Sequence, residues 1–253
     1  MLRVLKIIKF KIYIIIMEYC TVITIISIIL IIILFSYNNK EQFQNNWYEK
    51  IDGIVYINLE KREDRKKVIL KELEKIETDM SRVNKVSGIY IPKNGHKGCV
   101  QSHISALNIA KMNNWKQVLI FEDDMELNVS PDEFNNSINE MLDYVKDNIS
   151  WDVIMLATGH TNKTDVVGDI VRINSGTTSS GYIVNNHYYD KLIELFTNCN
   201  ENMTSDKWSG GAEWEPYALD QQWRQLQEND NWYGFKKDLI KQRNISSTIM
   251  ERK

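Results

Sequence analysis

The chain has 253 residues, of which 43% are hydrophobic and 26% charged, and its net charge is −3 at pH 7. This length accommodates one large domain or two small ones. Because the net charge is negative, the chain lacks the basic footprint of a nucleic-acid-binding protein, and no nucleic-acid partner is expected. Two of its three cysteines, Cys99 and Cys199, lie outside the N-terminal segment, and we expect free thiols rather than a disulfide framework.

The N-terminal segment, residues 1–36, carries a long apolar run. From Cys20 to Phe35 nearly every side chain is apolar, and Ile12 to Met17 extend the run upstream. A membrane-spanning helix needs about 20 apolar residues, so we predict one transmembrane helix that stays as an anchor, with a cleaved signal peptide as the alternative.

Basic residues on the N-terminal side of this run predict the orientation of the chain. They are Arg3, Lys6, Lys9 and Lys11. Their position places the N-terminus in the cytoplasm and the C-terminal part on the lumenal (ER/Golgi-type) or other non-cytoplasmic side, as a single-pass membrane protein. Translation from Met17 would remove this basic flank.

Residues 37–50 are polar and rich in Asn and Gln, which predicts a stalk before a single domain over 51–253. In that domain, short apolar runs alternate with amphipathic stretches. We expect strands at 53–59, 82–86, 118–121, 151–156, 170–173 and 181–184, with helices after the first, second, third and last of them. This alternation predicts an α/β fold with a mostly parallel central sheet, in which ligands bind beyond the carboxyl ends of the strands.

Three consecutive carboxylates, Glu122, Asp123 and Asp124, follow the third of these strands. They repel one another and resist burial, so a bystander loop has little reason to hold them there, although a solvated acidic turn is the simple alternative. A divalent cation would remove the repulsion, and oxygen ligands suit hard ions such as Mg²⁺ or Mn²⁺. Receiver domains have a similar acidic pair, but their phospho-accepting Asp should end a later strand, and none follows Leu156 directly.

Two further segments offer anion-binding groups. Arg62 and Arg65 follow the first strand, and their planar guanidinium groups suit phosphate oxygens, the alternative being a solvated helix start with local ion pairs. Residues 95–103 join glycines to a helix start, where free backbone N–H groups bind anions. His103 in this segment is by itself more typical of a structural histidine, and the other histidines show no ligand spacing among themselves, so the sequence does not predict a zinc site.

In this order the segments resemble glycosyltransferase family 25, which includes lipooligosaccharide glycosyltransferases and procollagen galactosyltransferases. The similarity covers about residues 54 to 241. It is carried by residues 57–65 (INLEKREDR), 95–103 (GHKGCVQSH), 121–124 (FEDD) and 151–156 (WDVIML), by the strand around Tyr182, and by Asp220 in 218–223 (ALDQQW).

The resemblance implies a GT-A-like nucleotide-diphospho-sugar transferase fold. It further implies inverting transfer of a sugar, galactose or glucose, from a UDP-sugar donor to a hydroxyl of a glycan or protein acceptor. Asp124 and Asp123 would bind Mn²⁺ or Mg²⁺, and Asp220 would act as the general base. The donor would contact Asn58, Leu59, Arg62, Arg65, Ser102, His103, Glu122 and Asp123.

The C-terminal end departs from the family pattern. The procollagen enzymes have a His-containing segment near the metal, whereas this chain continues with Gln242 and Arg243 after Lys241. A missing ligand would weaken the metal site, or leave a catalytically silent relative that binds a nucleotide sugar or a glycan. A metal-dependent transferase that acts on phosphate rather than on sugar is a further alternative.

Overall fold

The computed structural model describes residues 11, 17, 19–33, 46–92, 94–159, 161–203 and 216–243. The chain divides into two units, Met1–Asn46 and Trp47–Lys253. In the first unit residues 19–33 are helical and their side chains are exposed throughout. Among the described residues, no helix is both long and apolar enough to span a bilayer. The rest of the expected anchor, and residues 37–45 of the expected stalk, lie outside the described residues.

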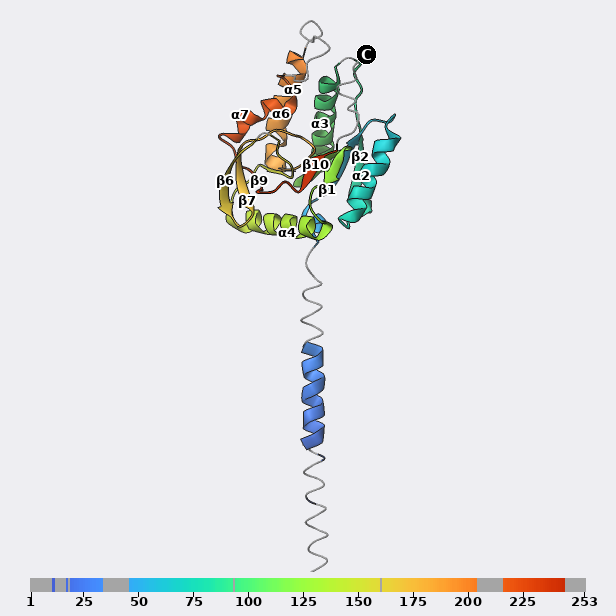
Figure 1. Ribbon diagram of the computed structural model, residues 1–253, viewed down its shortest axis with the longest axis vertical. Coiled ribbons are helices and arrows are strands. Elements are labelled where there is room, and N and C mark those ends of the chain that lie inside the picture. Colours follow the sequence, from blue (N-terminus) through green and yellow to red (C-terminus); the bar gives the residue numbers. More distant parts are fainter. Residues whose placement is uncertain are drawn as a thin grey trace, which may run out of the picture. The chain divides into compact units, whose positions relative to one another are not determined.

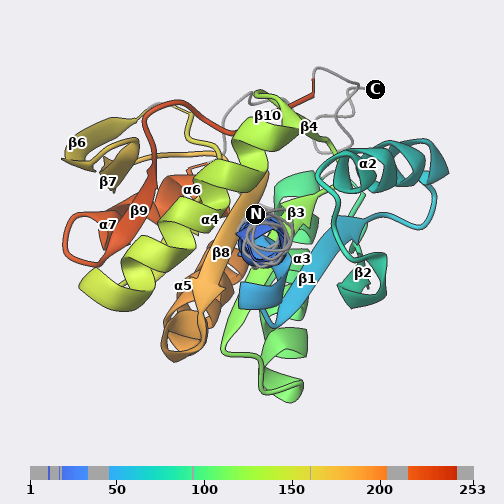
Figure 2. The same ribbon diagram turned by 90° about the horizontal axis from the view of Figure 1, so that it is seen from below.

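The second unit is an α/β structure with helices on both faces of a central sheet (Figures 1 and 2). Among the described residues this sheet has eight strands in the order β2-β1-β3-β8-β5-β9-β7-β6. Their bounds are β1 (Gly53–Asn58), β2 (Val83–Ser87), β3 (Gln117–Glu122), β5 (Val153–Met155), β6 (Asn162–Val167), β7 (Ile170–Ser175), β8 (Gly181–Asn185) and β9 (Trp232–Phe235). A separate antiparallel pair joins β4 (Met125–Leu127) to β10 (Ile240–Gln242).

The α/β architecture predicted from the sequence is confirmed, and the sheet is mixed. Strand β1 pairs in parallel with β2 and β3, and β5 with β9, whereas β8 lies antiparallel between β3 and β5. Parallel pairing is therefore confined to two parts of the sheet instead of extending across it as expected. One cause is the short turn at Gly168, which has a φ of +54° and joins β6 to β7 as a hairpin, because strands so closely connected pair antiparallel.

Alternate residues of each central strand supply two separate hydrophobic clusters. Leu119 and Phe121 face α2 (Glu63–Lys75) and α4 (Pro131–Asn148), whereas Val118 and Ile120 belong to the cluster that contains α3 (Gly95–Met112) and α5 (Tyr189–Asn202). The second cluster also takes in the short helices α6 (Leu219–Gln222) and α7 (Arg224–Gln227). The remaining short elements are the 3₁₀ helices η1 (Trp47–Lys50), η2 (Met80–Arg82) and η3 (Asn186–Tyr188).

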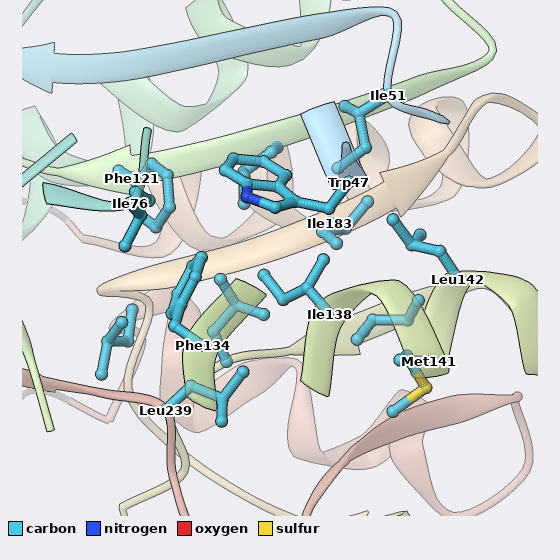
Figure 3. Close-up of a cluster of buried hydrophobic side chains, with 14 of the residues drawn as sticks. Trp47, Ile51, Ile76, Phe121, Phe134, Ile138, Met141, Leu142, Ile183 and Leu239 are labelled. Carbon is cyan, nitrogen blue, oxygen red and sulfur yellow. The ribbon is translucent and has the colours of Figure 1, made fainter. Parts of the chain in front are cut away.

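The folded unit begins at Trp47, earlier than the boundary at residue 51 expected from the sequence. Trp47 is 1% exposed, its ring packs against Phe134 with centroids 5.8 Å apart, and its indole N–H donates to Asn135 Oδ1 at 2.8 Å (Figure 3). Ile51 is also fully buried. Because the preceding residues are rich in Asn and Gln, the sequence pattern did not indicate that the side chain of Trp47 is buried in the core.

The chain connections create a switch point between β1 and β3. Helix α2 leads from β1 to β2 over one face of the sheet, and α3 leads from β2 back past β1 to β3 over the other. Because the two connections leave in opposite directions, the carboxyl ends of β1 and β3 flank a crevice, which is where α/β sheets bind ligands.

Candidate active site

Side chains from the ends of β1 and β3 meet at this switch point. Asn58, the last residue of β1, donates from Nδ2 to Asp123 Oδ2 at 2.7 Å. Arg65 of α2 donates from Nη1 to Asp123 Oδ1 at 2.9 Å and to Asp124 Oδ2 at 3.3 Å. The buried guanidinium group bridges the two aspartates and offsets part of their mutual repulsion.

Glu122 is held by a different set of groups, which come from α3 and from the loop between β7 and β8. Ser179 Oγ donates to Glu122 Oε1, and His103 Nε2 lies 3.3 Å from the same oxygen. Burial acts to raise the pKa of Glu122, but the hydrogen bonds from His103 and Ser179 and the charge of Arg65 hold this pKa below its ordinary value. Glu122 is therefore a fixed anion in the site.

Asp124 is held by the C-terminal segment. Gln242 Nε2 donates to Asp124 Oδ2 at 3.1 Å, and the backbone N–H of Arg243 donates to the Asp124 carbonyl at 2.7 Å. Burial, together with the charge of Glu122, raises the pKa of Asp124 to about 7. Gln242 was not predicted as a site residue, although it lies where this chain departs from the family's His-containing segment.

The arrangement fits a hard divalent cation at Asp124. Its Oδ1 is buried and has no hydrogen-bond partner among the described residues, so one oxygen ligand is available in an anionic environment. Asp123 differs, because Asn58 and Arg65 already bind both of its oxygens. The two aspartates therefore share Arg65, whereas Glu122 is held by His103 and Ser179.

A pocket opens beside these groups. It is lined by residues that follow β1, β2 and β3 and by the first turns of α3, including Leu59, Arg65, Ser102, His103, Glu122, Asp123 and Asp124 from the expected donor and metal sites. Ser102 shapes the wall, because its hydroxyl accepts from the Ile89 N–H at 2.8 Å and donates to the Gly98 carbonyl at 2.7 Å. A Cβ at Gly98 would lie 2.2 Å from the Ile89 carbonyl oxygen, so this close approach requires glycine.

Arg62 is placed differently from Arg65. Its guanidinium group pairs with both oxygens of the exposed Asp64, at 2.9 Å from Nε to Oδ1 and 2.8 Å from Nη2 to Oδ2. Arg62 is not among the described residues that line the pocket. This local ion pair is the alternative that the sequence left open for the basic segment.

Asp220 lies at the start of α6. The loop between β7 and β8 binds both Asp220 and Glu122 through neighbouring residues. The Thr178 N–H donates to Asp220 Oδ2 at 3.1 Å, while the next residue, Ser179, binds Glu122. Thr178 has a φ of +79°, a strained conformation for a β-branched residue, and such strain is typical of functional loops. Burial raises the pKa of Asp220, and the charge of Glu122 adds to the rise.

Part of the chain matches one protein-family model. Residues 93–208 match the family model described as "Glycosyltransferase family 25 (LPS biosynthesis protein)". This match confirms the resemblance over residues 93–208, whereas the segments 57–65 and 218–223 lie outside the matched range. No curated protein matches the sequence significantly.

Three solved structures show low similarity to this chain. One is a mannose-1-phosphate geranyltransferase from Thermus thermophilus, with a TM-score of 0.43, 9% identity and coverage of 72% of each chain. A glycosyltransferase involved in the glycosylation of the major capsid of PBCV-1 has a TM-score of 0.39 and 12% identity, over 72% of this chain and 92% of that chain. A197 from STIV has a TM-score of 0.37 and 9% identity, over 77% of this chain and 95% of that chain.

Proposed function

We propose that this chain, a glycosyltransferase with a family 25 domain over residues 93–208, transfers galactose or glucose from a UDP-sugar to a glycan or protein hydroxyl with inversion, on a GT-A-like fold. The observation that carries the proposal is the grouping of Asn58, Arg65 and two buried aspartates at the carboxyl ends of β1 and β3. Arg65 and the two aspartates line a pocket at the switch point, where α/β sheets bind nucleotide ligands.

The donor diphosphate would bind in the pocket beside Arg65 and Asp124. Arg65 lines the pocket, and a guanidinium group held by two carboxylates is a preorganised cation for phosphate oxygens. Mn²⁺ or Mg²⁺ bound through Asp124 would supply further positive charge for the diphosphate leaving group. Asn58 positions Asp123, while Ser102 and His103 shape the pocket wall.

Asp220 is the proposed general base. It would take the proton of the acceptor hydroxyl while the acceptor oxygen bonds to the anomeric carbon and the bond from that carbon to the diphosphate breaks. Burial raises its pKa, which makes the carboxylate a stronger base than an exposed aspartate. The Thr178 N–H holds the carboxylate in place.

A donor screen tests the proposal. The full-length protein would be incubated with Mn²⁺, a panel of nucleotide sugars and acceptor sugars, and the released nucleotide measured by mass spectrometry. We expect turnover with a UDP-hexose, and a loss of about 10²-fold or more in Asp124→Asn, the magnitude typical of lost charge stabilisation. Asp132→Asn, on the exposed start of α4, is the matched control. Absence of nucleotide release with every donor would contradict the proposal.

One observation favours a second candidate, a catalytically silent relative that binds a nucleotide sugar or glycan. Gln242 occupies Asp124 Oδ2, and an amide side chain there replaces the family's His-containing segment. Calorimetry with UDP-sugars decides between the two, because binding without any turnover supports the silent relative. Turnover that depends on added Mn²⁺ excludes it.

The N-terminal unit is proposed to anchor the chain in a membrane, with its N-terminus cytoplasmic and the catalytic unit lumenal or otherwise non-cytoplasmic. The described helix exposes isoleucines along its length, and its hydroxyl groups are satisfied within the helix. Thr21, Thr24 and Ser27 donate to the carbonyl four residues earlier at 2.7, 2.8 and 2.9 Å, which removes their need for water. The full chain should resist carbonate extraction and an Ile26→Arg/Leu30→Arg variant should not; complete extraction of the unaltered chain would contradict anchoring.

A further inference from the structure

Three potential metal ligands of different kinds converge in the pocket. Cys99 and His103 lie four residues apart on α3, so they share one face of the helix, and Glu122 faces them from the end of β3. One ligand atom from each lies within 4.8 Å of the other two. In the described part of the chain this is the one group of three such side chains whose ligand atoms come so close together.

The orientation of His103 is typical of a metal-binding histidine. The ring is completely buried, and its Nδ1 lies 2.8 Å from the Tyr182 hydroxyl, which leaves Nε2 directed toward Glu122. A second partner that fixes the other ring nitrogen is the usual support of a histidine ligand. Ser179 donates to Glu122 Oε1, the oxygen that faces His103 Nε2, and so fixes the position of this carboxylate.

We propose that Cys99, His103 and Glu122 form a Zn²⁺ site, separate from the oxygen-ligand site at Asp124. Sulfur, nitrogen and carboxylate ligands together suit zinc, whereas Mg²⁺ and Mn²⁺ prefer oxygen ligands. Three protein ligands leave the fourth tetrahedral position open. All three side chains line the pocket, so the site lies at the pocket wall.

The present distances are close to those of a bound site. His103 Nε2 and Glu122 Oε1 are 3.3 Å apart, which matches two neighbouring ligands on a tetrahedral ion with bonds of about 2.0–2.2 Å. Because the ligand atoms lie within 4.8 Å of one another, closing the site around zinc requires the Cys99 sulfur to move by no more than on the order of 1 Å. Binding converts the Cys99 thiol to the thiolate, and the displaced proton passes to solvent.

Cobalt substitution tests the site without any assay of activity. The full-length protein in detergent would be stripped with a chelator and titrated with Co²⁺, whose bond to a thiolate gives a charge-transfer band in the near ultraviolet. We expect this band to saturate at about one equivalent of Co²⁺ per chain and to disappear when Zn²⁺ displaces the cobalt. A titration without a thiolate band overturns the proposal.

Variants identify the ligands. Cys99→Ala should lose the band, whereas Cys199→Ala, which alters a free cysteine on α5, and Asp124→Asn, which alters the oxygen site, should both keep it. A band that persists in Cys99→Ala overturns the assignment. If Cys99→Ala does not fold, Glu122→Gln provides the same test, because it should lower the zinc affinity at least about 10-fold and an unchanged affinity would refute the site. The inference rests on side-chain geometry alone, so a negative donor screen leaves it standing.

Discussion

At the scale of single residues, Arg65 and Arg62 show how burial changes what a guanidinium group contributes. Arg65 is 7% exposed and bridges two buried aspartates, whereas Arg62 pairs with the exposed Asp64. We expect Arg65→Ala to cost about 3–5 kcal/mol of unfolding free energy, because it leaves buried carboxylates without their counter-ion. Arg62→Ala, the matched control, should leave the urea midpoint nearly unchanged. Equal midpoints for the two variants would show that Arg65 does not compensate the aspartates.

Asp124 should make the stability of the metal-free protein depend on pH. Its pKa is about 7 in the folded protein and 3.8 as the ordinary value. Between these values the folded protein holds a proton that the unfolded chain has lost, so the free energy of unfolding falls as pH rises. In EDTA, Asp124→Asn should therefore raise the Tm by at least about 2 °C at pH 7.5, and by less at pH 5. A lower Tm for the variant at pH 7.5 would contradict the raised pKa.

At the scale of elements, the loop between β7 and β8 stores strain while it holds two carboxylates. Thr178 has a φ of +79°, whereas its neighbour Thr177 does not have a positive φ. Thr178→Gly should therefore stabilise the protein by about 1 kcal/mol, because glycine adopts this conformation freely. Thr177→Gly should have the opposite sign, since it adds backbone freedom to the unfolded chain and removes a buried side chain. Urea unfolding of both variants measures the difference, and destabilisation by Thr178→Gly would rule out the strain.

Elements with strong local signals were predictable from the sequence. Helix α4 begins as expected, with Ser130 accepting from the Glu133 N–H at 3.2 Å and Pro131 in the first turn. Strands β4, β6, β9 and β10 were not predicted. They have three to six residues each, and β10 is defined by pairing with β4 more than a hundred positions earlier. The pattern of residues within a short strand does not indicate which distant segment it pairs with.

The site shows the same division between local and long-range information. Asn58, Arg65 and the aspartates could be predicted to meet, because the carboxyl ends of parallel strands lie at one edge of the sheet. The contact of Gln242 with Asp124 depends on β10 pairing with β4 and could not be predicted. The grouping of Cys99 with Glu122 likewise needs the packing of α3 against the sheet, although the four-residue spacing from Cys99 to His103 was visible in the sequence.

At the scale of the whole molecule, the position of the site follows from the order of the strands. Strands β2, β1 and β3 are parallel neighbours, and β8 closes the group in the antiparallel direction while delivering Tyr182 to His103. The aspartates follow β3 directly, and α2 and α3, which connect these strands, bring Arg65 and His103 to the same edge of the sheet. Loops with high freedom are not needed to bring these groups together, which is consistent with a preorganised polar site.

The boundary of the catalytic unit gives the last prediction. Trp47 and Ile51 are buried in the same hydrophobic cluster as the inward side chains of α4, so the fold needs residues that precede β1 (Figure 3). A chain that begins at Asn46 should unfold in urea at the midpoint of the full-length protein, since the two units are compact separately. A chain that begins at Asp52 loses both side chains and should be less stable by about 3–5 kcal/mol or more, the cost of deleting a buried tryptophan. Trp47→Ala in the full-length protein is the matched control and should reproduce most of this loss. Equal midpoints for the two truncated chains would show that the fold begins at β1 and that η1 is dispensable.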